Sequence, residues 1–181
     1  MPTFYHHSSP EWDPERWFNT GNGWSRSGEY GEAIRCYSNA IELAPRFTAA
    51  WVNRGATKLN IHDDFAGAKA DFDVAIKLGC NMAGVYTNRG IVKAILGDSE
   101  GAMDDHARSI SADASLGTNY AARALTRTRI GDLIGAVQYC RLARQLDPAL
   151  TRTTILDHFD KLLGTERVEP FRQAFPEDPT K

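Results

Sequence analysis

The sequence predicts an all-α fold in which four helical hairpins stack along the chain. An aromatic residue stands four residues before a small residue four times, and the small residues recur at spacings of 34, 35 and 34 residues. A series of alanines keeps step at spacings of 35, 34 and 34 residues. A fixed period of this length is typical of helix-turn-helix units that stack into a solenoid. The positions are Trp17, Trp51, Tyr86 and Tyr120, then Gly21, Gly55, Gly90 and Ala124, then Ala33, Ala68, Ala102 and Ala136.

The first repeat, residues 14–47, carries the fullest set of markers. They are Trp17, Gly21, Trp24, Gly28, Ala33, Tyr37, Ala40 and Pro45. In this order and spacing of aromatic, glycine, alanine, aromatic and proline, the chain resembles the tetratricopeptide repeat family. The resemblance implies a right-handed α-solenoid of four such hairpins over residues 14–148.

Three further repeats follow, at residues 48–82, 83–116 and 117–148. Gly55 and Ala68 are 13 residues apart where the other repeats have 12, so the turn near residues 60–64 is predicted to be one residue longer. The third and fourth repeats place His106 and Cys140 where the second helix otherwise has an aromatic residue.

Both ends of the array show helix signals. Residues 1–13 form an N-terminal segment that ends in Asp13, a good N-cap before the proline that opens the first helix. Residues 149–164 read as a capping helix with one apolar face, terminated by Gly164. In the tail, residues 165–181, a short helix is expected at 167–174.

Composition excludes several function classes. A net charge of −2 lacks the clustered basic face that nucleic-acid binding needs. The sequence has no apolar run of membrane-spanning length and no cationic leader, so no membrane partner is expected and a cytoplasmic location is the default. Cys36, Cys80 and Cys140 lack disulfide or zinc spacing and are expected to be reduced thiols.

No catalytic constellation stands out in the sequence. Phosphate-binding loops, nucleophile elbows and HExxH motifs are missing, so we expect a non-catalytic protein without cofactor or metal. His106 falls at a packing position, and the pair His6 and His7 lies in a segment expected to be mobile. His62 and Asp63 fall in the lengthened turn, where turn chemistry explains them.

Arginine recurs immediately before the repeat's small residue. Arg54 and Arg89 have Asp71 and Asp105 at the matching place on the second helix, which predicts ion pairs within two hairpins. Arg123 has Tyr139 at that place, so no ion pair is predicted in the fourth repeat.

The resemblance places the ligand-binding surface on the concave face formed by the first helix of each hairpin. In the first part of this concave groove the inward-facing positions hold a row of asparagines, here called the asparagine ladder, which could hydrogen-bond an extended peptide backbone. In the second half of the groove these positions are apolar. The residues expected to bind peptide are Asn19, Asn22, Asn53, Asn88, Ile91, Ile95, Leu125 and Arg129. Solvated surface asparagines are the alternative reading of the ladder. Family members that bind chaperone tails use basic residues at positions that here read Phe18, Gly84 and Asn88, so an acidic tail is not the expected ligand.

These observations predict a protein-interaction adaptor or scaffold that binds a peptide or a helical segment of a partner. The alternatives are a homo-oligomerisation module and an autoinhibited array whose own tail, through Phe171 and Phe175, occupies the groove. An enzyme is the remaining and weakest alternative.

Overall fold

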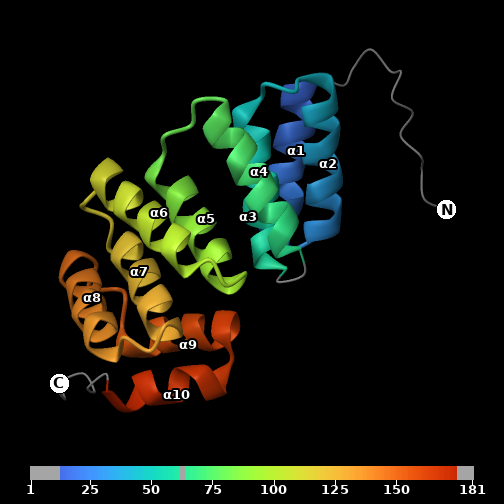
Figure 1. The fold of residues 1–181 in the computed structure, drawn as a ribbon. Helices are drawn as coiled ribbons and strands as arrows, with labels where there is room; N and C mark the ends of the chain where they lie inside the picture. Colours follow the sequence, from blue (N-terminus) through green and yellow to red (C-terminus); the bar gives the residue numbers. More distant parts are fainter. Residues whose placement is uncertain (1–12, 62–63, 175–181) are drawn as a thin grey trace. The chain divides into compact units, whose positions relative to one another are not determined.

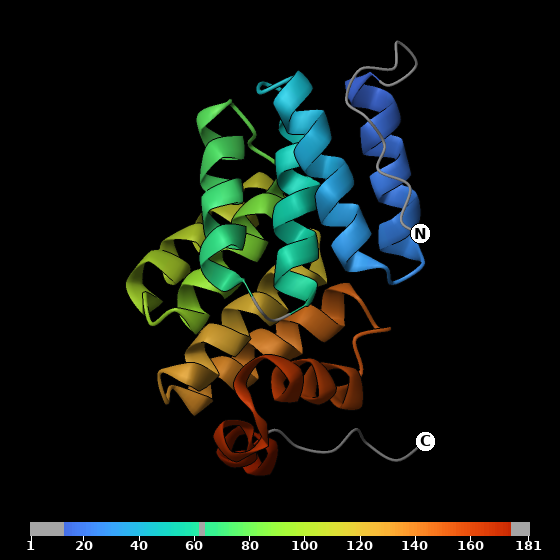
Figure 2. The same cartoon turned by 90° about the vertical axis from the view of Figure 1, so that its right-hand side faces the viewer.

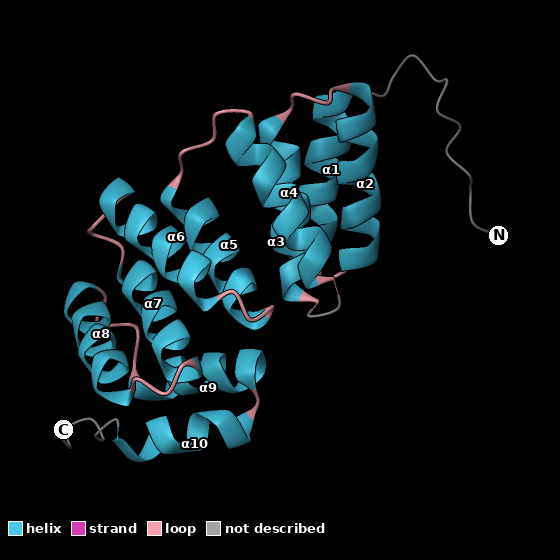
Figure 3. Ribbon diagram, viewed as in Figure 1, coloured by secondary structure: helices cyan, strands magenta, loops and turns pink. Residues whose placement is uncertain are grey.

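The computed structural model describes residues 13–61 and 64–174, and all regular structure within them is α-helical (Figures 1 and 3). The chain divides into two compact units, Met1–Cys80 and Asn81–Lys181. The first unit holds α1 (Pro14–Arg26), α2 (Tyr30–Leu43), α3 (Thr48–Asn60) and α4 (Phe65–Lys77). The second holds α5 (Ala83–Ile95), α6 (Ser99–Ala112), α7 (Gly117–Arg129), α8 (Leu133–Leu146), α9 (Arg152–Leu163) and α10 (Thr165–Ala174).

Sequential helices pair into hairpins in both units. In the first unit α1 packs on α2 and α3 on α4, with α2 joining the two hairpins through contacts with α3 (Figure 2). In the second unit α5 pairs with α6 and α7 with α8, and α6 contacts α7. The predicted hairpin array is therefore confirmed.

Turn chemistry sets where the paired helices end and begin. Gly97 and Gly131 adopt φ of 95° and 81°, left-handed backbone that a residue with a Cβ rarely occupies. Asp98 and Asp132, one residue later, cap the next helix by accepting from the main-chain N–H groups of the residues three positions on. These connections are three residues long, whereas α3 and α4 are joined by four, which confirms the longer second turn.

Close approach of the paired helices centres on the repeat's small residues. A Cβ built on Gly90 would lie 2.6 Å from Cε1 of His106 and 3.2 Å from the carbonyl oxygen of Ala102. Gly55 faces Phe72 in the same way, at 3.0 Å. The facing alanines, including Ala68 and Ala102, are fully buried. Small residues at these points are thus required by the packing of each hairpin.

The C-terminal helices pack against the fourth hairpin. Helix α9 begins at Arg152, later than the expected residue 149, because Thr151 caps it. Gly164 ends it at φ 82°. Helix α10 is longer than the expected 167–174, and its buried Phe171 packs on Phe159 of α9 with ring centroids 5.3 Å apart. Both helices contact α7, and α10 also contacts α8, so part of the expected tail belongs to the core of this unit.

Several residues named from the sequence fall outside the described part of the chain. They are His6, His7, His62, Asp63 and Phe175.

The contact at Gly90 predicts the effect of adding one methyl group. Gly90→Ala should lower the free energy of unfolding by about 1–3 kcal/mol, because the buried His106 ring must move. The matched control is Gly84→Ala in the same helix, where an added Cβ meets nothing within 4 Å. It should be neutral or stabilising by about 0.5 kcal/mol. Urea unfolding followed by circular dichroism measures both, and equal effects would contradict the close-approach argument.

Candidate functional site: a polar pocket in the first unit

A polar pocket of about 430 Å³ opens between helices of the first two repeats. It lies wholly within the first unit and is formed by α1, α2 and α3. Two of the predicted peptide-binding residues, Asn22 and Asn53, line it. The full lining is Asn22, Ser25, Arg26, Tyr37, Asn53, Ala56, Thr57 and Asn60.

Asn22 and Asn53 are joined directly by a hydrogen bond. The side-chain amide of Asn53 donates from Nδ2 to Oδ1 of Asn22 over 2.7 Å. The Tyr37 hydroxyl donates to the same oxygen over 2.9 Å. Tyr37 is itself buried and faces Gly21, which fixes its ring. The Asn22 carboxamide is therefore oriented by two neighbours from two other helices.

This pairing leaves complementary polar atoms on the two amides. A carboxamide offers two N–H donors and one oxygen acceptor. Asn22 uses its oxygen, so its Nδ2 retains both donors, and Asn53 uses one donor, so its Oδ1 retains its acceptor capacity. Arg26 adds a cation at the rim, where its Nε donates to the main-chain oxygen of Asn22 over 3.1 Å.

The remaining predicted ladder residues lie elsewhere. Asn19 is exposed on α1 and does not line the polar pocket. Asn88 is half-buried on α5 of the second unit. Tyr37 was not predicted as a site residue. The repeat pattern marks its position only as that of a packed aromatic ring and does not indicate a role for the hydroxyl group.

The predicted apolar half is mostly core. Leu125 is fully buried on α7, which contacts α9 and α10, and Ile91 is 6% exposed on α5. Ile95 is half-buried, and its main-chain oxygen accepts from Nη2 of Arg129 over 3.2 Å. Leu125 therefore offers no surface to a ligand and Ile91 very little, which corrects the sequence-based expectation for these two residues.

Phe18 is also a packing residue. The sequence placed it where related chaperone-binding repeats have a basic side chain, and its ring packs on Tyr37 and Phe47 at centroid distances of 5.9 and 5.0 Å. Its position contributes apolar contacts rather than charge.

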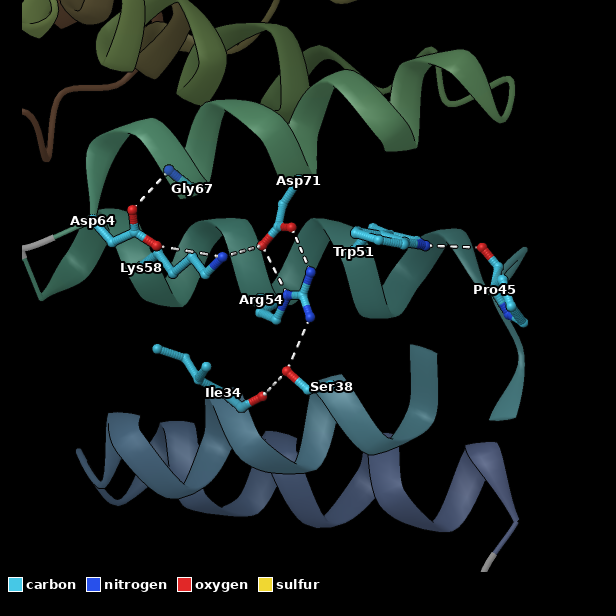
Figure 4. Close-up of polar contacts among 9 residues, drawn as sticks. All are labelled: Ile34, Ser38, Pro45, Trp51, Arg54, Lys58, Asp64, Gly67 and Asp71. Carbon is cyan, nitrogen blue, oxygen red and sulfur yellow. Dashed lines mark hydrogen bonds and ion pairs between the residues drawn. The ribbon is translucent and has the colours of Figure 1, made fainter. Parts of the chain in front are cut away.

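The predicted ion pair in the second repeat is formed, and it is part of a larger network (Figure 4). Arg54 donates from Nε and Nη2 to both oxygens of Asp71 over 2.9 and 2.7 Å. Its Nη1 donates to Ser38 of the preceding repeat over 2.9 Å, so the charge network also links two hairpins. Lys58 adds a second cation 3.1 Å from Asp71. Lys58 and Ser38 are not marked by the repeat pattern, so their part in this network was not predicted from the sequence.

The third repeat has the same arrangement. Arg89 donates from Nε and Nη2 to both oxygens of Asp105 over 2.8 and 2.6 Å, and Lys93 lies 2.9 Å away. Burial raises the pKa of Asp105, but the hydrogen bonds from Arg89 and Lys93 outweigh it and leave the pKa below its usual value. In the fourth repeat Arg123 instead stacks over Tyr139, 5.0 Å from the ring centroid.

His106 is a core residue of the third hairpin. Its ring is fully buried, and Nε2 shares a hydrogen bond of 2.8 Å with the Thr126 hydroxyl. Burial, reinforced by the charge of Arg123, lowers the pKa of His106 from 6.5 to about 4. The imidazole is neutral at pH 7, as a packing role requires.

Within residues 13–61 and 64–174, no three potential metal ligands gather. None of the helices described is long and apolar enough to cross a membrane.

Comparison with known proteins matches residues 14–47 to the family described as Tetratricopeptide repeat. RNA polymerase II-associated protein 3 of Xenopus tropicalis is 32% identical over 93 residues, which are 51% of this chain but only 14% of that protein. The crystal structure of MamA protein has a similar fold, with a TM-score of 0.67 and 19% identity over 89% of each chain. The first repeat domain of Spaghetti (RPAP3), bound to HSP90 peptide SRMEEVD, matches with a TM-score of 0.55 and 22% identity over 74% of this chain and 91% of that one.

The Arg54 network predicts a structural role that stability can measure. Arg54→Ala should lower the free energy of unfolding by about 3 kcal/mol, because Asp71 is 3% exposed and loses its bidentate partner. Arg35→Ala is the control, since Arg35 is 67% exposed and its ion pair with Glu32 lies on the surface. It should cost less than about 1 kcal/mol. An Arg54 variant that unfolds like the wild type would show that the pair does not support the fold.

His106 predicts acid sensitivity with a defined window. Because the folded-state pKa is lowered, the unfolded chain takes up this proton first as the pH falls. Stability should therefore decline between pH 6.5 and 4, by about 3 kcal/mol in total, and be fully present above pH 6.5.

The control for this pH dependence follows the chain's own pattern. His106→Phe places at this position the residue type that Phe72 supplies in the second repeat. Urea unfolding of both proteins from pH 7 to 4.5 should give a flatter pH dependence for the variant. Parallel curves would assign the acid sensitivity to other groups.

Proposed function

We propose that this chain, whose residues 14–47 match the tetratricopeptide repeat family, is a protein-interaction module that holds an extended peptide of a partner in the polar pocket of its first unit. The proposal places the peptide main chain against Asn22 and Asn53. It retains the expected peptide ligand but confines the contact to the polar half of the predicted groove.

One observation carries the proposal. The Asn53–Asn22 hydrogen bond leaves an N–H donor on one amide and an oxygen acceptor on the other, both at the pocket. A peptide unit presents the opposite pair, a carbonyl acceptor and an N–H donor. Two hydrogen bonds to one stretch of main chain would contribute about 0.5–1.5 kcal/mol each. Backbone contacts of this kind are indifferent to sequence, so specificity would come from the side chains around them.

The pocket carries too little positive charge to select an acidic peptide. Arg26 is the cation among the lining residues, and the positions that are basic in chaperone-binding members hold Phe18, Gly84 and Asn88. The similar repeat domain of Spaghetti (RPAP3) binds SRMEEVD, which carries two glutamates and an aspartate. With Arg26 as the one cation among the described lining residues, we expect this chain to bind that peptide and an analogue in which those three residues are neutral with similar affinity.

The test uses peptides of known sequence. Seven-residue peptides enriched from a random display library are labelled, and their dissociation constants are measured by fluorescence anisotropy. Asn53→Ala removes the acceptor and the bond that orients Asn22, and should weaken binding about 3- to 10-fold. SRMEEVD is measured in parallel, with its neutral analogue SRMQQVN.

Asn39→Ala is the matched control, because Asn39 lies on α2 but does not line the pocket. It should bind like the wild type, with both variants equally helical by circular dichroism. Unchanged affinity in Asn53→Ala would rule out the amide pair as the peptide site.

A further inference from the structure

A second pocket, of about 420 Å³, lies in the second unit at the turns of the third and fourth repeats. Two of its walls are equivalent turns, one after α5 and one after α7, each with a left-handed glycine. The third wall is α10, which packs against α7. The lining is Gly97, Ser99, Thr128, Arg129, Gly131 and Arg167.

Two arginines from different elements face this turn pocket. Arg129 comes from the end of α7, and one of its five N–H groups is used by the Ile95 carbonyl. Arg167 comes from α10 and is exposed, and its guanidinium forms neither an ion pair nor a hydrogen bond with any residue in the described part of the chain. Burial lowers the pKa of Arg129, and the charge of Arg167 lowers it further, so the two guanidinium groups are near enough to repel.

The carboxylates beside the two turns are engaged elsewhere. Asp98 accepts from the main-chain N–H of Gly101 over 2.9 Å, as the cap of α6. Asp132 accepts from the N–H of Gly135 and pairs with Arg127. Neither aspartate is hydrogen-bonded to Arg129 or Arg167. Within the described residues, two positive charges therefore come together, and neither is ion-paired with a carboxylate.

We propose that the turn pocket binds an oxyanion group, a phosphate or a carboxylate, held between Arg129 and Arg167. Guanidinium groups present parallel N–H donors that match the paired oxygens of both anions. The Ser99 hydroxyl is a further donor in the lining. A volume of about 420 Å³ is within the usual range of small-molecule sites. The ligand is thus an oxyanion attached to a small molecule or to a side chain.

This inference goes beyond the peptide site. It uses neither Asn22 nor Asn53, and it involves a different unit of the chain. If the polar pocket bound no peptide, the proposal for the turn pocket would still stand, and a failure of the turn pocket would likewise not affect the peptide proposal.

The test titrates the full chain with inorganic phosphate, sulfate and acetate at constant ionic strength. Amide resonances of Gly97 and Gly131 are followed in ¹⁵N-resolved NMR spectra, and the melting temperature is measured alongside. Saturable shifts at these two glycines are expected. Arg167→Gln should raise the apparent dissociation constant for the anion at least about 10-fold. Because Arg167 holds no described partner, the unliganded variant should melt no lower than the wild type.

Two further variants complete the design. Arg129→Gln should weaken anion binding to a similar degree, and if it folds poorly Arg167→Gln decides alone. Arg108→Gln is the control, because Arg108 is exposed on α6 and does not line the pocket. It should bind like the wild type.

The results separate the possible sources and decide the proposal. Saturation by phosphate and sulfate alone assigns a tetrahedral dianion, and saturation by acetate assigns a carboxylate; either supports the site. Linear shifts without saturation, or equal affinity in Arg167→Gln and wild type, would overturn it.

Discussion

The close approach of the two helices within each hairpin is the constraint on which the rest of the structure depends. At Gly55 and Gly90 the first helix runs so near the second that a Cβ would meet a ring. The residue before each glycine therefore lies at the edge of this helix–helix contact. This is why Arg54 and Arg89 reach a buried aspartate on the facing helix. The close packing and the ion pair therefore both result from how the first helix of the hairpin is aligned against the second.

The second unit shows what happens when the repeat's side chains change but its register does not. His106 fills an aromatic position and stays neutral there, at the cost of stability in acid. Arg123 keeps its place without an aspartate opposite, and its guanidinium settles on the ring of Tyr139. Each substitution is tolerated because the alternative side chain still fills the space and meets one suitable group.

The periodicity of the sequence predicted the features that recur in each repeat. It did not predict the features that depend on contacts with other helices outside the repeating pattern. Hairpins, the longer second turn and both arginine–aspartate pairs follow from spacing alone. The burial of Leu125 does not, because it depends on helices after the last repeat whose packing the period does not encode. The bond between Asn22 and Asn53 was also missed. The projected ladder compared equivalent positions of successive repeats, whereas this bond joins non-equivalent ones.

The orientation of Asn22 has a consequence for recognition. A surface asparagine loses side-chain freedom when it binds, and that loss opposes affinity by roughly 0.5–1.5 kcal/mol. Here the loss occurs on folding, because Tyr37 and Asn53 hold the carboxamide before any peptide arrives. The buried position of Tyr37 follows from the hairpin contact at Gly21. The contact that fixes the fold therefore also orients the donor that we propose binds the peptide, and a weak hydrogen bond there can contribute nearly its full value.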